Sequence, residues 1–207
     1  MDFSDTTLLD VIWTRGWESL REKPVRCPVM FIQEFYSNIH DIDTVVPQFV
    51  TTFKGTHIAV TPDLIFEVLR IPKVVHPDYP SCDRLRIVSK DELSPLFYET
   101  PSSWGDRQNI IFSGFAKGQR FLNMVMTFIL HPLSHYNSII EPRSQFWLSL
   151  LKDISIDFLS HFILSLIDVY RDTVTCDKII FLRLLHGSFA IFLFHIQCLH
   201  TFSLCVP

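Results

Sequence analysis

The clearest pattern of hydrophobic and polar positions is a pair of short runs, residues 49–53 and 56–60. Both runs are rich in β-branched and aromatic residues, and only Lys54 and Gly55 separate them. Strand-like runs joined by a glycine-containing dipeptide predict a β-hairpin with a tight turn. Gly55 should then take a positive φ, a conformation that strains other residues.

A helix is predicted directly after this hairpin. Thr61 suits the N-cap, Pro62 the first helical position, and Asp63 the positive end of the helix dipole. Pro72 should stop the helix. The side chains expected on its buried face are Leu64, Ile65, Val68 and Leu69.

A second amphipathic helix is predicted upstream, where Pro28 suits a first turn. Hydrophobic residues recur at 31, 35 and 39, with 32 and 36 beside them. We therefore expect Phe35 to be buried and Glu34 to be exposed. The polar residues that follow are interpreted as the end of this helix rather than as ligands: Asn38, His40 and Asp41.

The N-terminal segment, residues 6–23, also has helical spacing, with Leu9, Trp13 and Trp17 four residues apart. Gly16 weakens this amphipathic helix, and the Lys-Pro pair at 23–24 ends it.

The second half of the chain is predicted to be helical at 118–130, 142–153 and 156–172, after a connection at 73–88. The pattern favours a mainly α fold with a small β-hairpin (α+β), in a single helical domain. We divide the chain into an N-terminal amphipathic helix (1–24), a central domain (25–186) and an apolar tail (187–207).

The tail has no Asp, Glu, Lys or Arg, and its length just suffices to span a bilayer. His195, Gln197 and His200 lie near its middle, where hydrocarbon makes polar groups costly. We expect a helix at first, then poor packing, and no membrane span. Membrane contact is expected only through 187–207, if at all.

Composition narrows the class of protein. Hydrophobic residues make up 48% and charged residues 19% of the 207 residues, which is enough for a core. The net charge of −4 excludes a global cationic field for nucleic acid. The five cysteines form no C-x-x-C pair and no signal peptide is visible, so we expect reduced thiols and an intracellular protein.

Motifs for catalysis and cofactor binding are missing. Phosphate-binding glycine loops and the G-x-S-x-G elbow do not occur. Two groups of residues have a spacing that could bind a metal: His131 with His135, and His195 with Cys198 and His200. Each group has fewer than the four ligands of a closed zinc site. We therefore assign no catalytic, cofactor-binding or metal residue and no cofactor.

Three motifs together resemble the putative plant transposon protein domain, found in retrotransposon-derived reading frames of plant genomes. They are a Trp-containing N-terminal helix, "FIQEFYSNIHD" at 31–41 and "FKGTHIAVTPDLIFEVLRIP" at 53–72. Downstream, 120–137 and 146–163 resemble the later helical blocks of that family. The resemblance covers about residues 10–185 and ends before the tail. The matching positions are Glu34, Phe35, Tyr36, Asn38, Phe53, Lys54, Gly55, Ile58, Val60, Thr61, Ile65, Leu69, Arg70, Ile71 and Pro72.

The resemblance implies a transposable-element-derived domain without an established enzymatic activity. Our interpretation is a non-catalytic module for protein interaction, or for self-association through an aromatic surface. Two alternatives remain open. One is a protein tethered to membranes by its tail, and the other is a metal-dependent nuclease or transposase-like enzyme that uses acids of 153–172: Asp153, Asp157, Asp168 and Asp172.

Overall fold

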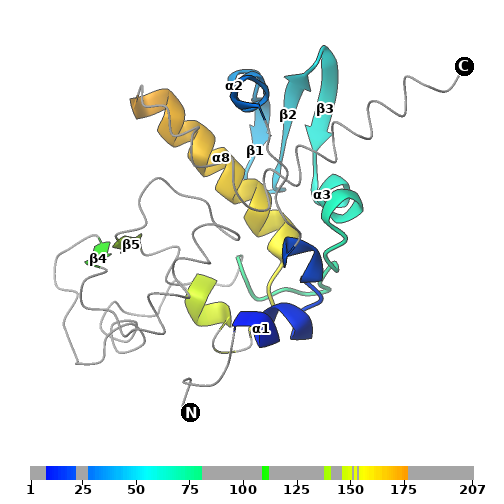
Figure 1. The fold of residues 1–207 in the computed structure, drawn as a ribbon, viewed down its shortest axis with the longest axis vertical. Helices are drawn as coiled ribbons and strands as arrows, with labels where there is room; N and C mark the ends of the chain where they lie inside the picture. The colour runs from blue at the N-terminus through cyan, green and yellow to red at the C-terminus, as the bar shows by residue number, and fades with distance from the viewer. Residues whose placement is uncertain are drawn as a thin grey trace, which may run out of the picture.

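The computed structural model describes residues 8–21, 28–80, 109–111, 138–140, 146–150, 152 and 154–176. The arrangement of these segments is drawn in Figure 1. In chain order the elements are α1 (Leu8–Thr14), the 3-10 helix η1 (Glu18–Arg21), α2 (Val29–Ser37), β1 (His40–Asp43), β2 (Gln48–Phe53), β3 (Thr56–Val60), α3 (Pro62–Leu69), β4 (Asn109–Ile111), β5 (Ser138–Ile140) and α8 (Phe158–Cys176).

A three-stranded antiparallel sheet in the order β1-β2-β3 organises the first half of the chain. Along β2, Phe49, Thr51 and Phe53 are buried, whereas the residues between them are only half-buried. Successive side chains of a strand point to opposite faces, so one face of the sheet is covered and the other is open. Helix α2 packs on the covered face, and α8 contacts both β2 and α3.

The predicted hairpin is confirmed. Residues 54 and 55 form its two-residue turn, with φ values of 50° and 73°. Two positive values in a row are typical of a type I′ turn, whose twist matches that of the strands. A hydrogen bond also joins the turn to α2, because the Lys54 amide donates to the Glu34 carboxylate over 2.8 Å. The Lys54 ammonium lies 4.3 Å from the centre of the Phe31 ring.

Replacing either of the two described glycines with positive φ by alanine should lower the stability of the fold, by different amounts. A Cβ at Gly55 would meet nothing within 4 Å, so Gly55→Ala should lower the free energy of unfolding by about 1 kcal/mol through backbone strain alone. At Gly16 (φ 67°) a Cβ would also lie 2.9 Å from the Pro72 ring, so Gly16→Ala should cost more. Urea denaturation of both variants measures this order, and a larger loss for Gly55→Ala would contradict it.

Helix α3 begins and ends as its sequence predicts. The Thr61 hydroxyl accepts a hydrogen bond from the Leu64 amide over 3.3 Å, and Pro62 occupies the first turn. Arg70 then takes a left-handed conformation, φ 56°, and its amide donates to the Phe66 carbonyl. The helix therefore ends before Pro72. Its fully buried side chains are Ile65, Val68 and Leu69.

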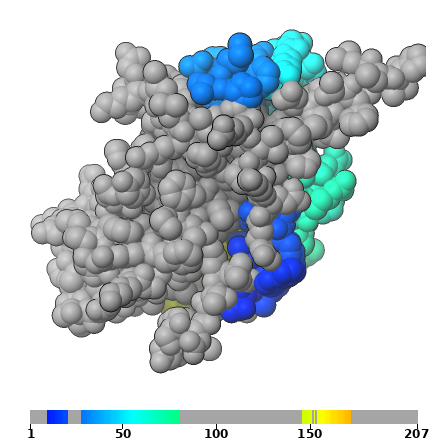
Figure 2. Space-filling view, in the orientation of Figure 1, coloured from blue at the N-terminus to red at the C-terminus, as the bar shows by residue number. Residues whose placement is uncertain are grey.

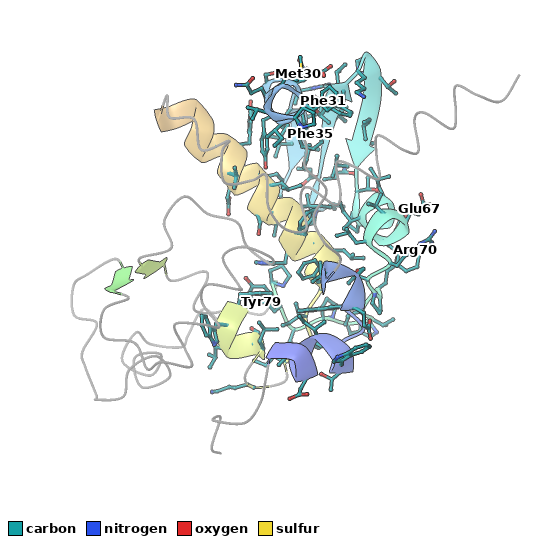
Figure 3. The ribbon with its side chains drawn as sticks, in the orientation of Figure 1. Met30, Phe31, Phe35, Glu67, Arg70 and Tyr79 are labelled. Carbon is teal, nitrogen blue, oxygen red and sulfur yellow. The ribbon has the colours of Figure 1, made fainter. Side chains whose placement is uncertain are left out.

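Helix α2 is a packing helix, as expected. Phe35 is 0% exposed and makes edge-on contacts with the rings of Tyr36 and Phe49. The expectation for Glu34 was wrong, because this side chain is half-buried and binds the Lys54 amide. Figure 3 shows Phe35 on the side of α2 that faces the sheet, and Met30 on the outer side of the helix.

The N-terminal helix is shorter than predicted and turns a different face inward. Gly16, in a left-handed conformation, follows the end of α1, and Ile12 and Trp17 are buried while Trp13 is 55% exposed. Trp17 packs on Phe158 with 4.9 Å between ring centres. The four-residue spacing placed Trp13 on the buried stripe because it assumed one continuous helix through Gly16.

The expected single helical domain is wrong, because the described residues contain the three-stranded sheet and a second antiparallel pair, β4-β5. The predicted α+β class fits the described structure in part. Strand β1 was missed since its sequence, His-Asp-Ile-Asp, has no run of β-branched or aromatic residues. Residues assigned to the polar end of α2, His40 and Asp41, belong to this strand.

Among the described helices, none combines the length and the apolar character needed to cross a bilayer. The tail at 187–207 and the helix expected at 118–130 lie outside the described residues.

Candidate functional site

The acidic residues proposed for a nuclease-like site do not converge where the structure describes them. The Asp157 carboxylate accepts a hydrogen bond from the Ser160 amide over 3.1 Å, so it caps the start of α8. Asp168 lies on the same helix eleven residues later, a rise of about 16 Å. Two-metal sites hold their ions roughly 4 Å apart, so these two acids cannot share one. Asp153 and the side chain of Asp172 are outside the described residues.

The metal spacings found in the sequence, His131 with His135 and His195 with Cys198 and His200, are also outside the described residues. Three basic residues that could have formed a local site for a polyanion also lie outside the described residues: Arg107, Lys117 and Arg120. Within the described segments, no group of three or more His, Cys, Asp or Glu side chains is arranged to hold a metal ion.

A buried polar pair joins distant parts of the chain. The Tyr79 hydroxyl lies 3.3 Å from Nδ1 of His161, and the His161 ring stacks on Phe146 with 4.1 Å between centres and 6° between planes. Burial lowers the pKa of His161 to about 3, so the imidazole is neutral. Burial raises the pKa of the Tyr79 hydroxyl, and the negative charge of Asp168 raises it further.

The main chain around Tyr79 is fixed to the segment before α8. Its amide donates to the Ser155 carbonyl over 3.1 Å, and its carbonyl accepts from the Asp157 amide over 2.9 Å. In Figure 3 Tyr79 lies between the helical turn at 146–150 and the start of α8. His161 is 4% exposed and lies against the rings of Tyr79, Phe146 and Phe158, so the pair links residues 71–80 to α8.

Among the large hydrophobic side chains that the structure describes as exposed, one is aromatic. The described ones are Trp13, Met30, Val45, Val46 and Val75. Figure 2 shows α2 beside the β2–β3 hairpin at the molecular surface. On α2, Met30 is exposed and Phe31 is half-buried. Scattered apolar residues of this kind are normal on soluble domains, so none of them defines a site alone.

The two edge strands of the sheet, β1 and β3, differ in how readily each can pair with a further strand. Strand β1 is irregular, with a register shift between His40 and Asp43 and a left-handed Asp41 (φ 49°). Strand β3 pairs with β2 in continuous register from Thr56 to Val60, and it contains no charged residue. Bulges and charges protect sheet edges from further pairing. In the described part of the sheet, β3 is therefore the edge available to another strand.

The chain was compared with protein-family models, curated proteins and solved structures. The chain matches the putative plant retrotransposon-related domain over residues 13–190, which is most of its length. No curated protein and no solved structure matches it. The matched range contains the sheet, α3 and α8, and thus both the β3 edge and the Tyr79–His161 pair. The chain belongs to the putative plant retrotransposon-related domain family.

Proposed function

We propose that this retrotransposon-related domain is a non-catalytic interaction module that associates with a second copy of itself through strand β3. The observation that carries the proposal is the regular, uncharged outer edge of β3. Among the groups considered for catalysis, Asp157 caps the start of α8 and the buried His161 contacts the Tyr79 hydroxyl.

Hairpin geometry determines which main-chain groups of β3 point outward. In a two-residue hairpin the residues that flank the turn, Phe53 and Thr56, exchange hydrogen bonds with each other. The pattern alternates, so Thr56, Ile58 and Val60 bond to β2. The amides and carbonyls of His57 and Ala59 then point to the open edge. The Thr52 carbonyl on the opposite side accepts from the Asn38 side chain, which agrees with this alternation.

A second copy can pair with this edge in a self-complementary register. If two β3 strands run antiparallel with Ile58 opposite Ile58 of the other copy, His57 faces Ala59 and Ala59 faces His57. Each of the two pairs exchanges two main-chain hydrogen bonds, and the small Ala59 leaves room for the imidazole. The two sheets then form one continuous sheet around a two-fold axis. An edge this short gives a weak dimer that forms in a concentration-dependent way.

Lysine at Ala59 should abolish the dimer. Ala59 is exposed in the monomer, so Ala59→Lys is compatible with the fold, but it places a cation in the centre of the pairing edge. Sedimentation velocity over a concentration series should show a monomer–dimer equilibrium for the wild-type full chain. The variant should stay monomeric at every concentration.

Val75→Lys is the matched control, since it adds the same charge at an exposed position away from the sheet. It should dimerise like the wild type. A wild-type chain that is monomeric throughout the series would refute the proposal. Equal association of Ala59→Lys and wild type would place self-association elsewhere on the molecule.

A further inference from the structure

Two histidines from different strands meet on the open face of the sheet. His40 of β1 pairs with Val50, and His57 of β3 pairs with Thr52. Val50 and Thr52 lie on the face of β2 opposite the buried Phe49, so both imidazoles project from the uncovered face. The two ring centres are 6.5 Å apart, with 82° between the planes.

The hydrogen bonds of each ring leave its Nε2 available as a ligand. Nδ1 of His40 lies 2.8 Å from the Asn38 carbonyl, which only accepts, so Nδ1 carries the proton in the neutral ring. Nδ1 of His57 lies 3.0 Å from the Thr52 hydroxyl, which can accept its proton in the same way. Metal-binding histidines commonly use such a bond to fix the tautomer and the orientation of the ring.

A carboxylate adds negative charge beside the pair. Oδ2 of Asp41 lies 3.7 Å from Nε2 of His40. The left-handed backbone of Asp41, at the irregularity in β1, allows adjacent residues of one strand to approach in this way. A cation near Nε2 is therefore favoured both by a nitrogen lone pair and by the field of the carboxylate.

We infer that His40 and His57 form a two-histidine site for a borderline divalent cation such as Zn²⁺, with water in its remaining positions. Zinc–nitrogen bonds of about 2.0 Å in tetrahedral geometry place two ring centres about 5 Å apart. The rings must approach by roughly 1.5 Å to bind, a movement that side-chain rotation supplies because both are exposed. Two protein ligands make the site open and exchangeable, unlike a closed structural zinc site.

Sequence spacing could not reveal this pair, because His40 and His57 are separated by a whole strand and two turns. The site also connects β1 to β3 across β2, so an ion there would link all three strands. Ligands that bind only the folded state raise Tm, and Zn²⁺ should do so here. The inference does not depend on dimerisation through β3.

The test is a Zn²⁺ titration of the full chain by calorimetry, with His40→Gln, His57→Gln and the control His76→Asn. His76 is also exposed, but it lies in the connection after α3. We expect wild type and His76→Asn to bind one Zn²⁺ that each glutamine variant binds at least tenfold more weakly. Zn²⁺ should raise the Tm of the first two proteins and not of the other two.

Nuclear magnetic resonance of the wild-type chain provides a second readout without substitution. The Hε1 signals of His40 and His57 should shift together during the titration. If those signals do not move, or if both glutamine variants bind Zn²⁺ as tightly as wild type, the site is refuted. In that case the ring contact is only a surface contact beside the Asp41 carboxylate, and any zinc bound belongs to other histidines.

Discussion

Replacing Phe35 by alanine is expected to lower the free energy of unfolding by about 3 to 5 kcal/mol, the range for deleting an enclosed aromatic ring. Phe35 is fully buried between α2 and β2, and its ring meets the edges of Tyr36 and Phe49. The Phe35 carbonyl also accepts a hydrogen bond from the Thr51 hydroxyl over 2.6 Å, and this bond joins α2 to β2. The truncation leaves a cavity where helix and sheet meet. Equilibrium urea unfolding measures the loss.

Met30→Ala on the same helix is the control. Met30 is 67% exposed, so its truncation removes little buried area and should change stability by less than about 0.5 kcal/mol. If the two variants lost similar stability, α2 would not be anchored through Phe35. A stable, soluble Phe35→Ala protein with wild-type unfolding behaviour would overturn the assignment of α2 as a core helix.

The elements that the sequence predicted well are those whose signals are local. Gly55 and Thr61 act within a few residues, through turn conformation and helix capping, and both have the predicted geometry. Strand β1 depends instead on pairing with β2, since its own side chains carry no strand pattern. Trp13 was misplaced for a related reason. Gly16 breaks the helix, and the helical phase assumed across it was wrong.

The candidate sites were beyond prediction because they depend on register and on distant contacts. Tyr79 and His161 are 82 positions apart, and nothing in the proline-rich connection around Tyr79 indicates its partner. His40 and His57 become neighbours only through the combined registers of β1-β2 and β2-β3. Asp157 and Asp168 belonged to the alternative of a nuclease-like site, which the sequence left open. Sequence alone could not decide whether these acids converge, whereas α8 keeps the two far apart.

Stability is expected to fall as the pH drops from 7 to 5, by about 2 kcal/mol from His161 alone. Burial lowers the pKa of His161 to about 3 in the folded chain, against an ordinary value near 6.5 in the unfolded chain. Above pH 6.5 neither state binds this proton, so the contribution of His161 to the free energy of unfolding does not change with pH. Between pH 6.5 and 3 the unfolded chain binds it and the folded chain does not, which favours unfolding by about 1.4 kcal/mol per pH unit.

His161→Gln separates this effect from the titration of carboxylates. Glutamine keeps a polar group near the Tyr79 hydroxyl but does not titrate, so the variant should be less stable at pH 7 and lose less stability between pH 7 and 5. His76→Asn removes an exposed histidine and should keep the wild-type slope. Urea unfolding at a series of pH values gives both slopes. Equal slopes for wild type and His161→Gln would mean that His161 binds its proton as readily in the folded chain as in the unfolded chain. The buried imidazole stacked on Phe146 and beside Tyr79 would then be the wrong description of this contact.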